Sequence, residues 1–167
     1  MADSNQNSGG VPDPNFEDPL SQYDPPEYSD PLEQSLVEEK VGVLQTQPYE
    51  SVPPDATIRE AVEKLIRIHH ACLLVEEDGK LVGMFTDRDF LNRVALEYEE
   101  LADQPVSSVM VKDPVYVYET EDAAATLSVM AVSGFRHVPV LNLEDKLVGI
   151  VTPRRVTQFL HEHASPE

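Results

Sequence analysis

The stretch DGKLVGMFTDRDF, residues 78–90, recurs later in the chain as EDKLVGIVTPRRV, residues 144–156. Gly83 and Gly149 hold the same place in the two copies and lie 66 positions apart. A repeat of this length in a chain of 167 residues predicts two copies of one structural unit. The copies differ at one chemically decisive place, because Asp89 of the first copy is Arg155 in the second.

Each copy predicts the element order β-α-β-β-α. In the first copy Asp55 or Thr57 can cap a helix whose apolar residues recur at helical spacing: Ile58, Ala61, Val62, Leu65 and Ile66. The second copy offers Leu127, Met130 and Ala131 as the inward side of the matching helix. The remaining expected elements are strands 50–52, 71–75 and 81–85 with helix 87–100, then strands 115–118, 137–141 and 147–151 with helices 123–132 and 153–163.

The two middle strands of each unit are joined by a short turn and are therefore predicted to be antiparallel. One such unit buries only one face of its sheet under its own helices. We therefore predict an α/β fold in which the two units pack sheet to sheet about a pseudo-twofold axis. The predicted boundaries are 35–101 for the first repeat and 106–163 for the second.

Residues 1–34 differ from the rest of the chain in composition. Prolines punctuate a stretch rich in Asp, Glu, Ser and Asn, and the first basic residue is Lys40. Such a composition buries too little apolar surface to offset the entropy of ordering, so the prediction is a disordered acidic tail. Its end overlaps a short helix expected from Pro31 to Lys40, with Pro31 in the first turn.

Charge and composition narrow the possible partners. The formal net charge of −19 repels polyanions, so neither nucleic acid nor an anionic membrane surface is an expected partner. The polar first ten residues indicate no secretory signal or anchor, and no run reaches the length of a membrane span. The single cysteine, Cys72, lies in an apolar run and is expected to be a core thiol, which agrees with a cytoplasmic protein.

The motifs in both copies resemble the cystathionine-β-synthase (CBS) domain, in the tandem pair called a Bateman module. The resemblance covers residues 43–163 and rests on four features. Val43-Leu44 and Val109-Met110 lead into the units, residues 57–61 open the first helix, residues 136–140 read RHVPV, and both copies carry Leu-Val-Gly-x-x-Thr. No single feature is specific, but all of them in order, twice, favour this fold.

The resemblance implies a non-catalytic module that binds adenosine-containing ligands in clefts between the repeats. AMP, ADP and ATP are the expected ligands, and S-adenosylmethionine ranks behind them. The recurring pattern Gly-x-x-Thr/Ser-x-x-Asp implies that Gly83, Thr86 and Asp89 form a site, with Asp89 on the ribose hydroxyls and Thr86 by the phosphate. A carboxylate can accept both hydroxyls of a diol, and Arg88 could reach a phosphate.

Purely structural roles are open alternatives at these positions. Thr86 and Asp89 have the spacing of a capping box, which needs no ligand and can coexist with ribose binding. In the second copy Thr152 can cap a helix, but Arg155 has no acceptor for ribose hydroxyls. Arg154 and Arg155 either contact the phosphate of a ligand held by Asp89 or are solvated helix residues.

Three groups near the ends of predicted elements carry further alternatives. Arg136 and His137 either contact a phosphate or form a strand-edge pair facing solvent. The pair at 69–70 ends the first helix, where interaction with the helix dipole is a sufficient explanation. The motif HEH at 161–163 lacks the spacing of a His-Glu-x-x-His metal site, so no metal is predicted.

The leading functional hypothesis is an adenine-nucleotide sensor that regulates an unknown partner protein and carries no catalytic site. The alternative is an interaction or scaffold module that has lost ligand binding, and Arg155 keeps it open. A twofold homodimer is also expected, because the helices leave apolar residues to cover. These residues include Phe90, Leu91, Val94, Val129 and Val132.

Overall fold

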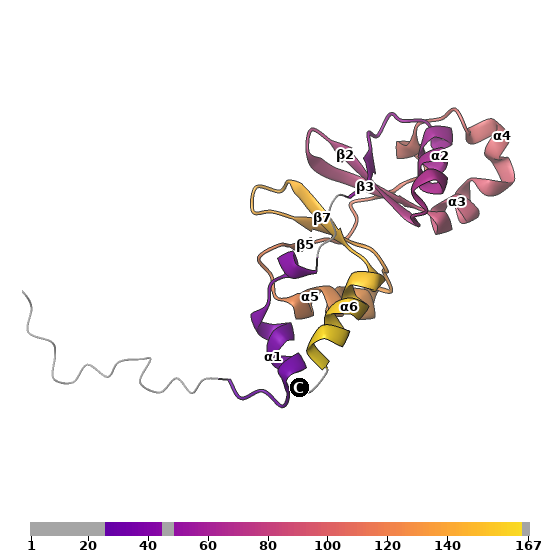
Figure 1. Ribbon diagram of the computed structural model, residues 1–167. Coiled ribbons are helices and arrows are strands. Elements are labelled where there is room, and N and C mark those ends of the chain that lie inside the picture. The colour runs from indigo at the N-terminus through magenta and orange to yellow at the C-terminus, as the bar shows by residue number, and fades with distance from the viewer. Residues whose placement is uncertain (1–25, 45–48, 165–167) are drawn as a thin grey trace, which may run out of the picture.

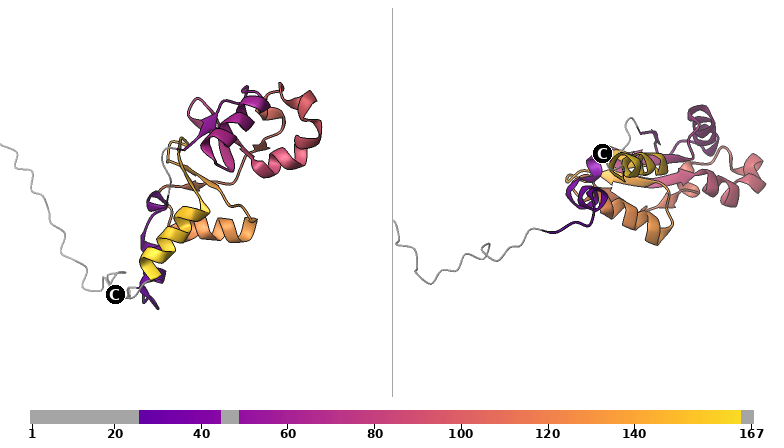
Figure 2. Two further views of the ribbon diagram at one scale, coloured as in Figure 1. Left: turned by 45° about the vertical axis from the view of Figure 1, so that its right-hand side comes forward. Right: turned by 60° about the horizontal axis from the view of Figure 1, so that its bottom comes forward.

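The computed structural model describes residues 26–44 and 49–164, which form two lobes, each a small sheet covered by helices (Figures 1 and 2). Most of the predicted acidic tail, residues 1–25, lies outside the described residues. Within the described residues, no helix is long and apolar enough to cross a membrane.

The first lobe spans residues 49–112 and carries a sheet of order β1-β2-β3-β4. Strands β1 and β2 are parallel, whereas β2–β3 and β3–β4 are antiparallel. Its elements are β1 (Ser51–Val52), α2 (Ile58–Ile68), β2 (Cys72–Glu77), β3 (Lys80–Thr86), α3 (Asp87–Arg93), η3 (Ala95–Glu97), α4 (Tyr98–Leu101), η4 (Val106–Ser108) and β4 (Val111–Lys112).

The second lobe repeats this plan with a sheet of order β5-β6-β7. Strands β5 and β6 are parallel, and β6 and β7 are antiparallel. Its elements are α1 (Pro31–Glu38), η2 (Val41–Val43), β5 (Val117–Tyr118), α5 (Ala123–Ser133), β6 (Val138–Leu141), β7 (Leu147–Val151) and α6 (Pro153–Ala164). The predicted β-α-β-β-α units and their antiparallel middle strands are confirmed.

The middle strands are apolar on both faces, and alternation divides their side chains between two cores. In β2, Leu73 and Val75 face the helices of the first lobe, whereas Cys72 and Leu74 point toward the second lobe. Leu141, Leu147 and Ile150 of the second sheet meet Cys72, Leu74 and Met84 in this inter-lobe cluster. The two sheets therefore pack face to face, and each strand reads as a continuous apolar run because both of its faces are buried.

The sequence repeats and the packed lobes do not have the same boundaries. We use "joining segments" for residues 39–44 and 105–110, which precede the two units. The first joining segment packs into the core of the second lobe through Val41 and Leu44, and the second packs into the first lobe through Val106, Val109 and Met110. Each lobe is therefore completed by the segment that leads into the other repeat.

Helix α1 belongs to the core of the second lobe. Asp30 caps it by accepting the Glu33 N–H at 2.8 Å, and Leu32 and Leu36 pack against the core between α5 and α6. The repeat places residues 31–38 opposite residues 97–104, so α1 is the counterpart of α4 in the first lobe. The helix expected from Pro31 is confirmed and ends at Glu38, so residues 31–34 of the predicted tail are its first half.

Three local expectations about helices fail. Ile66 and Ala131 were expected to face inward, but both are exposed, since only part of each apolar stripe contacts its sheet. The helix expected over 87–100 breaks at Val94, whose backbone leaves the helical region with ψ −41° at φ −124°. This break buries Val94 and brings Tyr98 edge-on to Phe90, with ring centroids 5.9 Å apart.

Candidate functional site: two clefts between the lobes

Two clefts open where the sheets meet, one at the end of β3 and the other at the end of β7. The first cleft has a volume of about 130 Å³ and is lined by Met84, Thr86, Arg88, Asp89, Arg136 and His137, among others. The second cleft has a volume of about 500 Å³ and is lined by His69, His70, His137, Thr152, Arg154 and Arg155, among others. Each cleft thus combines the helix start of one repeat with residues that precede a middle strand of the other.

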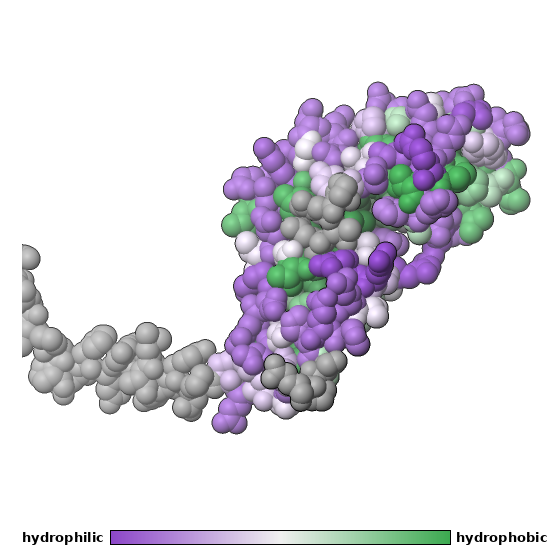
Figure 3. All heavy atoms as spheres, in the orientation of Figure 1, coloured by the Kyte–Doolittle hydropathy of each residue, from purple (hydrophilic) through white to green (hydrophobic). Residues whose placement is uncertain are grey.

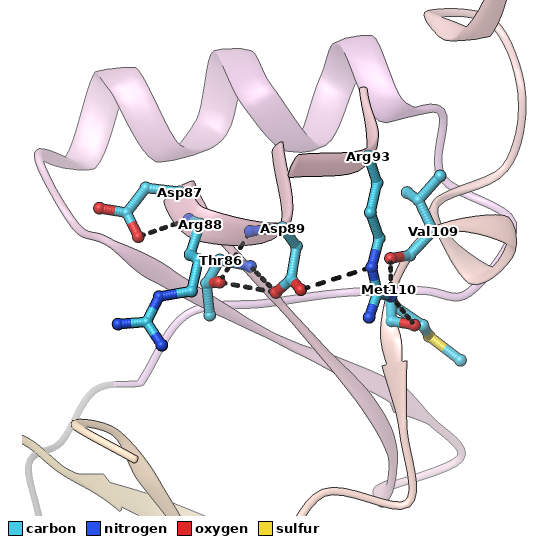
Figure 4. A network of polar contacts seen from close by, with 7 residues as sticks. All are labelled: Thr86, Asp87, Arg88, Asp89, Arg93, Val109 and Met110. Carbon is cyan, nitrogen blue, oxygen red and sulfur yellow. Dashed lines mark hydrogen bonds and ion pairs between the residues drawn. The ribbon is translucent and has the colours of Figure 1, made fainter. Parts of the chain in front are cut away.

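In the first cleft, Thr86 and Asp89 form the expected capping box at the start of α3 (Figure 4). The Thr86 hydroxyl oxygen accepts the Asp89 N–H at 3.2 Å. In return, Oδ2 of Asp89 accepts the Thr86 N–H at 3.1 Å and the Thr86 hydroxyl at 2.6 Å. The structural alternative for this pair is therefore confirmed, and it leaves Oδ1 of Asp89 outside the cap.

The second oxygen of Asp89 faces an arginine one turn further along the helix. Arg93 Nε lies 3.9 Å from Oδ1, and Arg93 Nη1 donates to the carbonyls of Val109 at 2.8 Å and Met110 at 3.2 Å. A continuous set of polar contacts thus runs from the cleft through Asp89 and Arg93 to the second joining segment (Figure 4). The carboxylate itself is largely buried, with 11% of its side chain exposed.

The opposite wall of the first cleft carries basic groups from the second lobe. Arg136 and His137 precede β6 and lie across from the start of α3. Burial lowers the pKa of His137, and the charges of Arg136 and His70 lower it further, while Asp87 acts in the opposite direction. A nearby anion favours the protonated form of an imidazole, so this wall, with His137 beside Arg136, is suited to a negatively charged group.

In the second cleft, the Arg155 side chain hydrogen-bonds to the protein backbone. It donates from Nη2 to the carbonyl of Val43 at 2.8 Å and from Nη1 to Oε1 of Gln158 at 3.0 Å. Its Nε is buried and has no hydrogen-bond partner in the described part of the chain. The cap of α6 is weak by comparison, because the Arg155 N–H lies 3.5 Å from the Thr152 hydroxyl and no carboxylate returns the bond.

The structure divides the predicted site residues between the clefts. Thr86, Arg88, Asp89 and Arg136 line the first, Thr152, Arg154 and Arg155 line the second, and His137 lines both. Arg154 and Arg155 therefore line the second cleft and are not among the residues that line the cleft of Asp89. Arg155 is not simply a solvated helix residue either.

Gly83, also predicted as a site residue, has a packing role. It is not among the residues that line either cleft. A Cβ at this position would lie 2.3 Å from the sulfur of Met110, so only glycine lets this side chain lie across β3. Gly83 therefore makes room for the Met110 side chain of the second joining segment.

Sequence reasoning missed several wall residues. Met84 and Val111 line the first cleft, and His69 and His70 line the second. His69 does end α2, in the left-handed region at φ 53°, as expected for a helix end. The repeat could have revealed its second role, since His69 ends α2 as Gly134 ends α5, and Gly134 lines the first cleft.

Comparison with known proteins agrees with the fold. The family model "CBS domain" matches residues 41–96 and 106–162. An uncharacterised 17.7 kDa protein of Acidianus ambivalens is 31% identical over 122 residues, covering 72% of this chain and 73% of that protein.

Two solved structures with bound AMP are similar. CBSX2 in complex with AMP has a TM-score of 0.68 and 26% identity, and the match covers 76% of this chain and 99% of that one. A CBS domain protein of Pyrobaculum aerophilum complexed with AMP has a TM-score of 0.66 and 25% identity over the same shares. The two lobes, the repeated helix starts and these matches together show that the chain belongs to the CBS domain family as a tandem pair.

Proposed function

We propose that this chain is a non-catalytic regulatory module that binds an adenine nucleotide in its first cleft and passes the occupancy to a partner protein. The observation that carries the proposal is the pairing of Thr86 and Asp89 from one lobe with Arg136 and His137 from the other. Similarity to two AMP complexes supports the ligand class.

The chemistry of the first cleft suits each part of a nucleotide. Oδ1 of Asp89 lies outside the capping box and can accept a ribose hydroxyl, while Oδ2 can share a second one. Arg88, Arg136 and His137 supply donors for a phosphate from both lobes. A ligand held this way bridges the lobes, so its binding energy would favour one arrangement of the two sheets.

Calorimetric titration with AMP, ADP and ATP tests this proposal. Asp89→Ala should lower the affinity roughly 10- to 150-fold, the effect of losing bonds between a diol and a carboxylate. Glu60→Ala is the matched control, because Glu60 closes an equivalent capping box with Thr57 at the start of α2, away from both clefts. Equal affinity of the Asp89 variant and the parent would remove Asp89 from the site.

A second candidate function is an interaction module without a ligand. The observation that favours it is the size of the first cleft, since about 130 Å³ falls below the roughly 300 Å³ of ordinary ligand pockets. Under this alternative the cap and the Arg93 contacts would be the whole purpose of Asp89. The same titrations separate the two functions, because the interaction module gives no binding heat with any of the three nucleotides.

We further propose a twofold homodimer in which helix surfaces of two modules meet. Leu91 and Val132 are exposed as predicted, at 67% and 88%, and Ile66 and Leu96 join them. Figure 3 shows hydrophobic residues gathered on the first lobe in the face that it draws. Phe90, Val94 and Val129 pack against their own cores and are not available for this interface. Light scattering of the parent and of Leu91→Glu measures the assembly state.

A further inference from the structure

Both lobes use an arginine to hold the same point of the backbone. Arg93 donates to the carbonyl of Val109 at 2.8 Å, and Arg155 donates to the carbonyl of Val43 at 2.8 Å. Val43 and Val109 are equivalent in the repeat, since they lie 66 positions apart at the end of the 3-10 turns η2 and η4. We call these two contacts the arginine clamps.

The clamps come from different positions on the closing helices. The repeat pairs Arg155 with Asp89, and it pairs Arg93 with Phe159. Phe159 is 4% exposed in the core of the second lobe, where it stacks on His163 with ring centroids 4.3 Å apart. A guanidinium cannot occupy that place, so the second lobe supplies it from one turn earlier, at the position that carries the carboxylate in the first lobe.

We propose that Arg93 is a positioning residue that ties Asp89 to the second joining segment. Arg155 is its counterpart in the second lobe, where the clamping guanidinium stands at the position of the carboxylate. The clamp position then decides which cleft can accept a ribose diol. It also makes the first cleft the one whose occupancy acts on the backbone at residues 109–112. This last step rests on the proposed function, whereas the equivalence of the clamps does not.

The walls of the first cleft lie close to the clamp. Met84 and Val111 both line the cleft, and they are paired across strands β3 and β4. The Met110 carbonyl accepts a hydrogen bond from Arg93, and the Met110 side chain packs over Gly83 of β3. A ligand hydroxyl that binds Asp89 would contact the carboxylate that faces Arg93. The same ligand would contact the cleft wall that includes Val111, so the clamp and the cleft share one set of contacts.

Amide hydrogen exchange at residues 111–112 without ligand is the first test. Arg93→Met should speed this exchange about tenfold, the factor for a lost hydrogen bond to a charged donor. Arg67→Met, an exposed arginine in the last turn of α2, is the matched control and should change nothing there. Unchanged exchange in the Arg93 variant would overturn the clamp.

Moving the clamp tests the equivalence of the two arginines. In the double variant Asp89→Arg with Arg93→Met, a guanidinium at position 89 should reach Val109 as Arg155 reaches Val43. Exchange at 111–112 should then return to within about twofold of the parent. Exchange as fast as in Arg93→Met alone would show that the positions are not equivalent. If this variant does not fold, Arg155→Met decides the point: it should speed exchange at residues 43–44 and leave 111–112 unchanged, and any other pattern contradicts the equivalence.

Hydrogen exchange with added AMP, with binding measured by calorimetry on the same samples, tests the coupling between the first cleft and the clamp. In the parent, saturating AMP should slow exchange at 111–112 at least about threefold, and in Arg93→Met the effect should disappear while AMP still binds. An equal effect in both proteins would overturn Arg93 as the link. If the parent binds none of AMP, ADP and ATP, the proposed function and the coupling both fail, while the ligand-free exchange still decides whether the clamps exist.

Discussion

The two clefts differ in a way that the shared backbone does not predict. The first has a carboxylate for a diol but a volume of about 130 Å³, whereas the second has about 500 Å³ and an arginine in place of the carboxylate. In the first lobe the acid and the clamping arginine are separate residues, Asp89 and Arg93. In the second lobe one residue, Arg155, occupies the acid's position and makes the arginine's contact.

This difference shows that a repeat can keep a backbone contact while exchanging the side chain that makes it. Both joining segments end in a carbonyl that a guanidinium satisfies, because an unpaired carbonyl at a lobe boundary is costly. What changes is the chemistry left at the helix start. The sequence difference at positions 89 and 155 therefore marks a structural asymmetry between the two helix starts.

The largest effect is expected at the equivalent positions 93 and 159. Phe159→Ala should lower the free energy of unfolding by about 3–5 kcal/mol, because it removes a ring from the core of the second lobe. Arg93→Ala should cost only about 1–2 kcal/mol, since its side chain is half exposed and loses two hydrogen bonds and a long ion pair to Asp89 rather than a buried ring. Urea denaturation measures both, and equal costs would contradict the different roles of the two positions.

Arg155→Asp should make the two clefts chemically more alike. The new carboxylate supplies a ribose acceptor in the larger cleft, so the number of nucleotides bound per chain should rise from one to two in calorimetry. The lost bond to Val43 should lower the free energy of unfolding by about 1–2 kcal/mol. A parent that already binds two equivalent nucleotides per chain would contradict the proposed asymmetry.

Helix α1 offers a third comparison, since it covers the second lobe as α4 covers the first. Leu36→Ala should cost about 1–2 kcal/mol in the free energy of unfolding, because Leu36 packs partly buried against the second core. Val37→Ala is the control at a more exposed position of the same helix, where 43% of the residue is exposed, and it should change stability by less than about 0.5 kcal/mol. Similar costs for both variants would show that α1 does not support this lobe.

Periodicity and the repeat were sufficient to predict most of the fold. Apolar runs predicted the middle strands and Thr86 predicted the cap of α3, because these signals are local. Of the two candidates for the cap of α2, Asp55 and Thr57, the structure uses Thr57. The exchange of the joining segments was not predictable, since Val41 and Val109 are buried through contacts with distant residues. The helix at Pro31 was predicted, but for the same reason its place was not, because the packing of Leu32 depends on a partner core that composition does not reveal.

The candidate site was predictable in its motif and not in its connections. The resemblance to the CBS domain implied Thr86 and Asp89 as site residues, but neither the bonds from Arg93 to residues 109–110 nor the bond from Arg155 to Val43 has a local signal. The latter joins residues 112 positions apart in the chain. An arginine can be solvated, bind phosphate or hold the backbone, and only its tertiary contacts show which of these roles it has.

The smallest effect concerns acid stability and compares His137 with Cys72. The two residues are equivalent, because Leu73 after Cys72 pairs with Phe85 and Val138 after His137 pairs with Val151. Burial raises the pKa of the Cys72 thiol, with Asp89 and Asp87 adding to the shift, so this residue stays protonated near neutral pH. Burial lowers the pKa of His137 below its ordinary value of 6.5. As the pH falls from 6.5 toward the lowered value, the unfolded chain takes up the proton first, so the folded state loses stability.

This loss is limited to one proton, at most about 1.4 kcal/mol per pH unit. Melting temperatures between about pH 7.5 and 5 should therefore fall less steeply for His137→Asn than for the parent, while His69→Asn, at the left-handed end of α2, should follow the parent. An anion in the first cleft favours the protonated imidazole, so nucleotide affinity should rise as the pH falls through the same window and lose this dependence in His137→Asn. An affinity that is flat across this range in the parent would remove His137 from the phosphate wall and leave Arg88 and Arg136 as its basic groups.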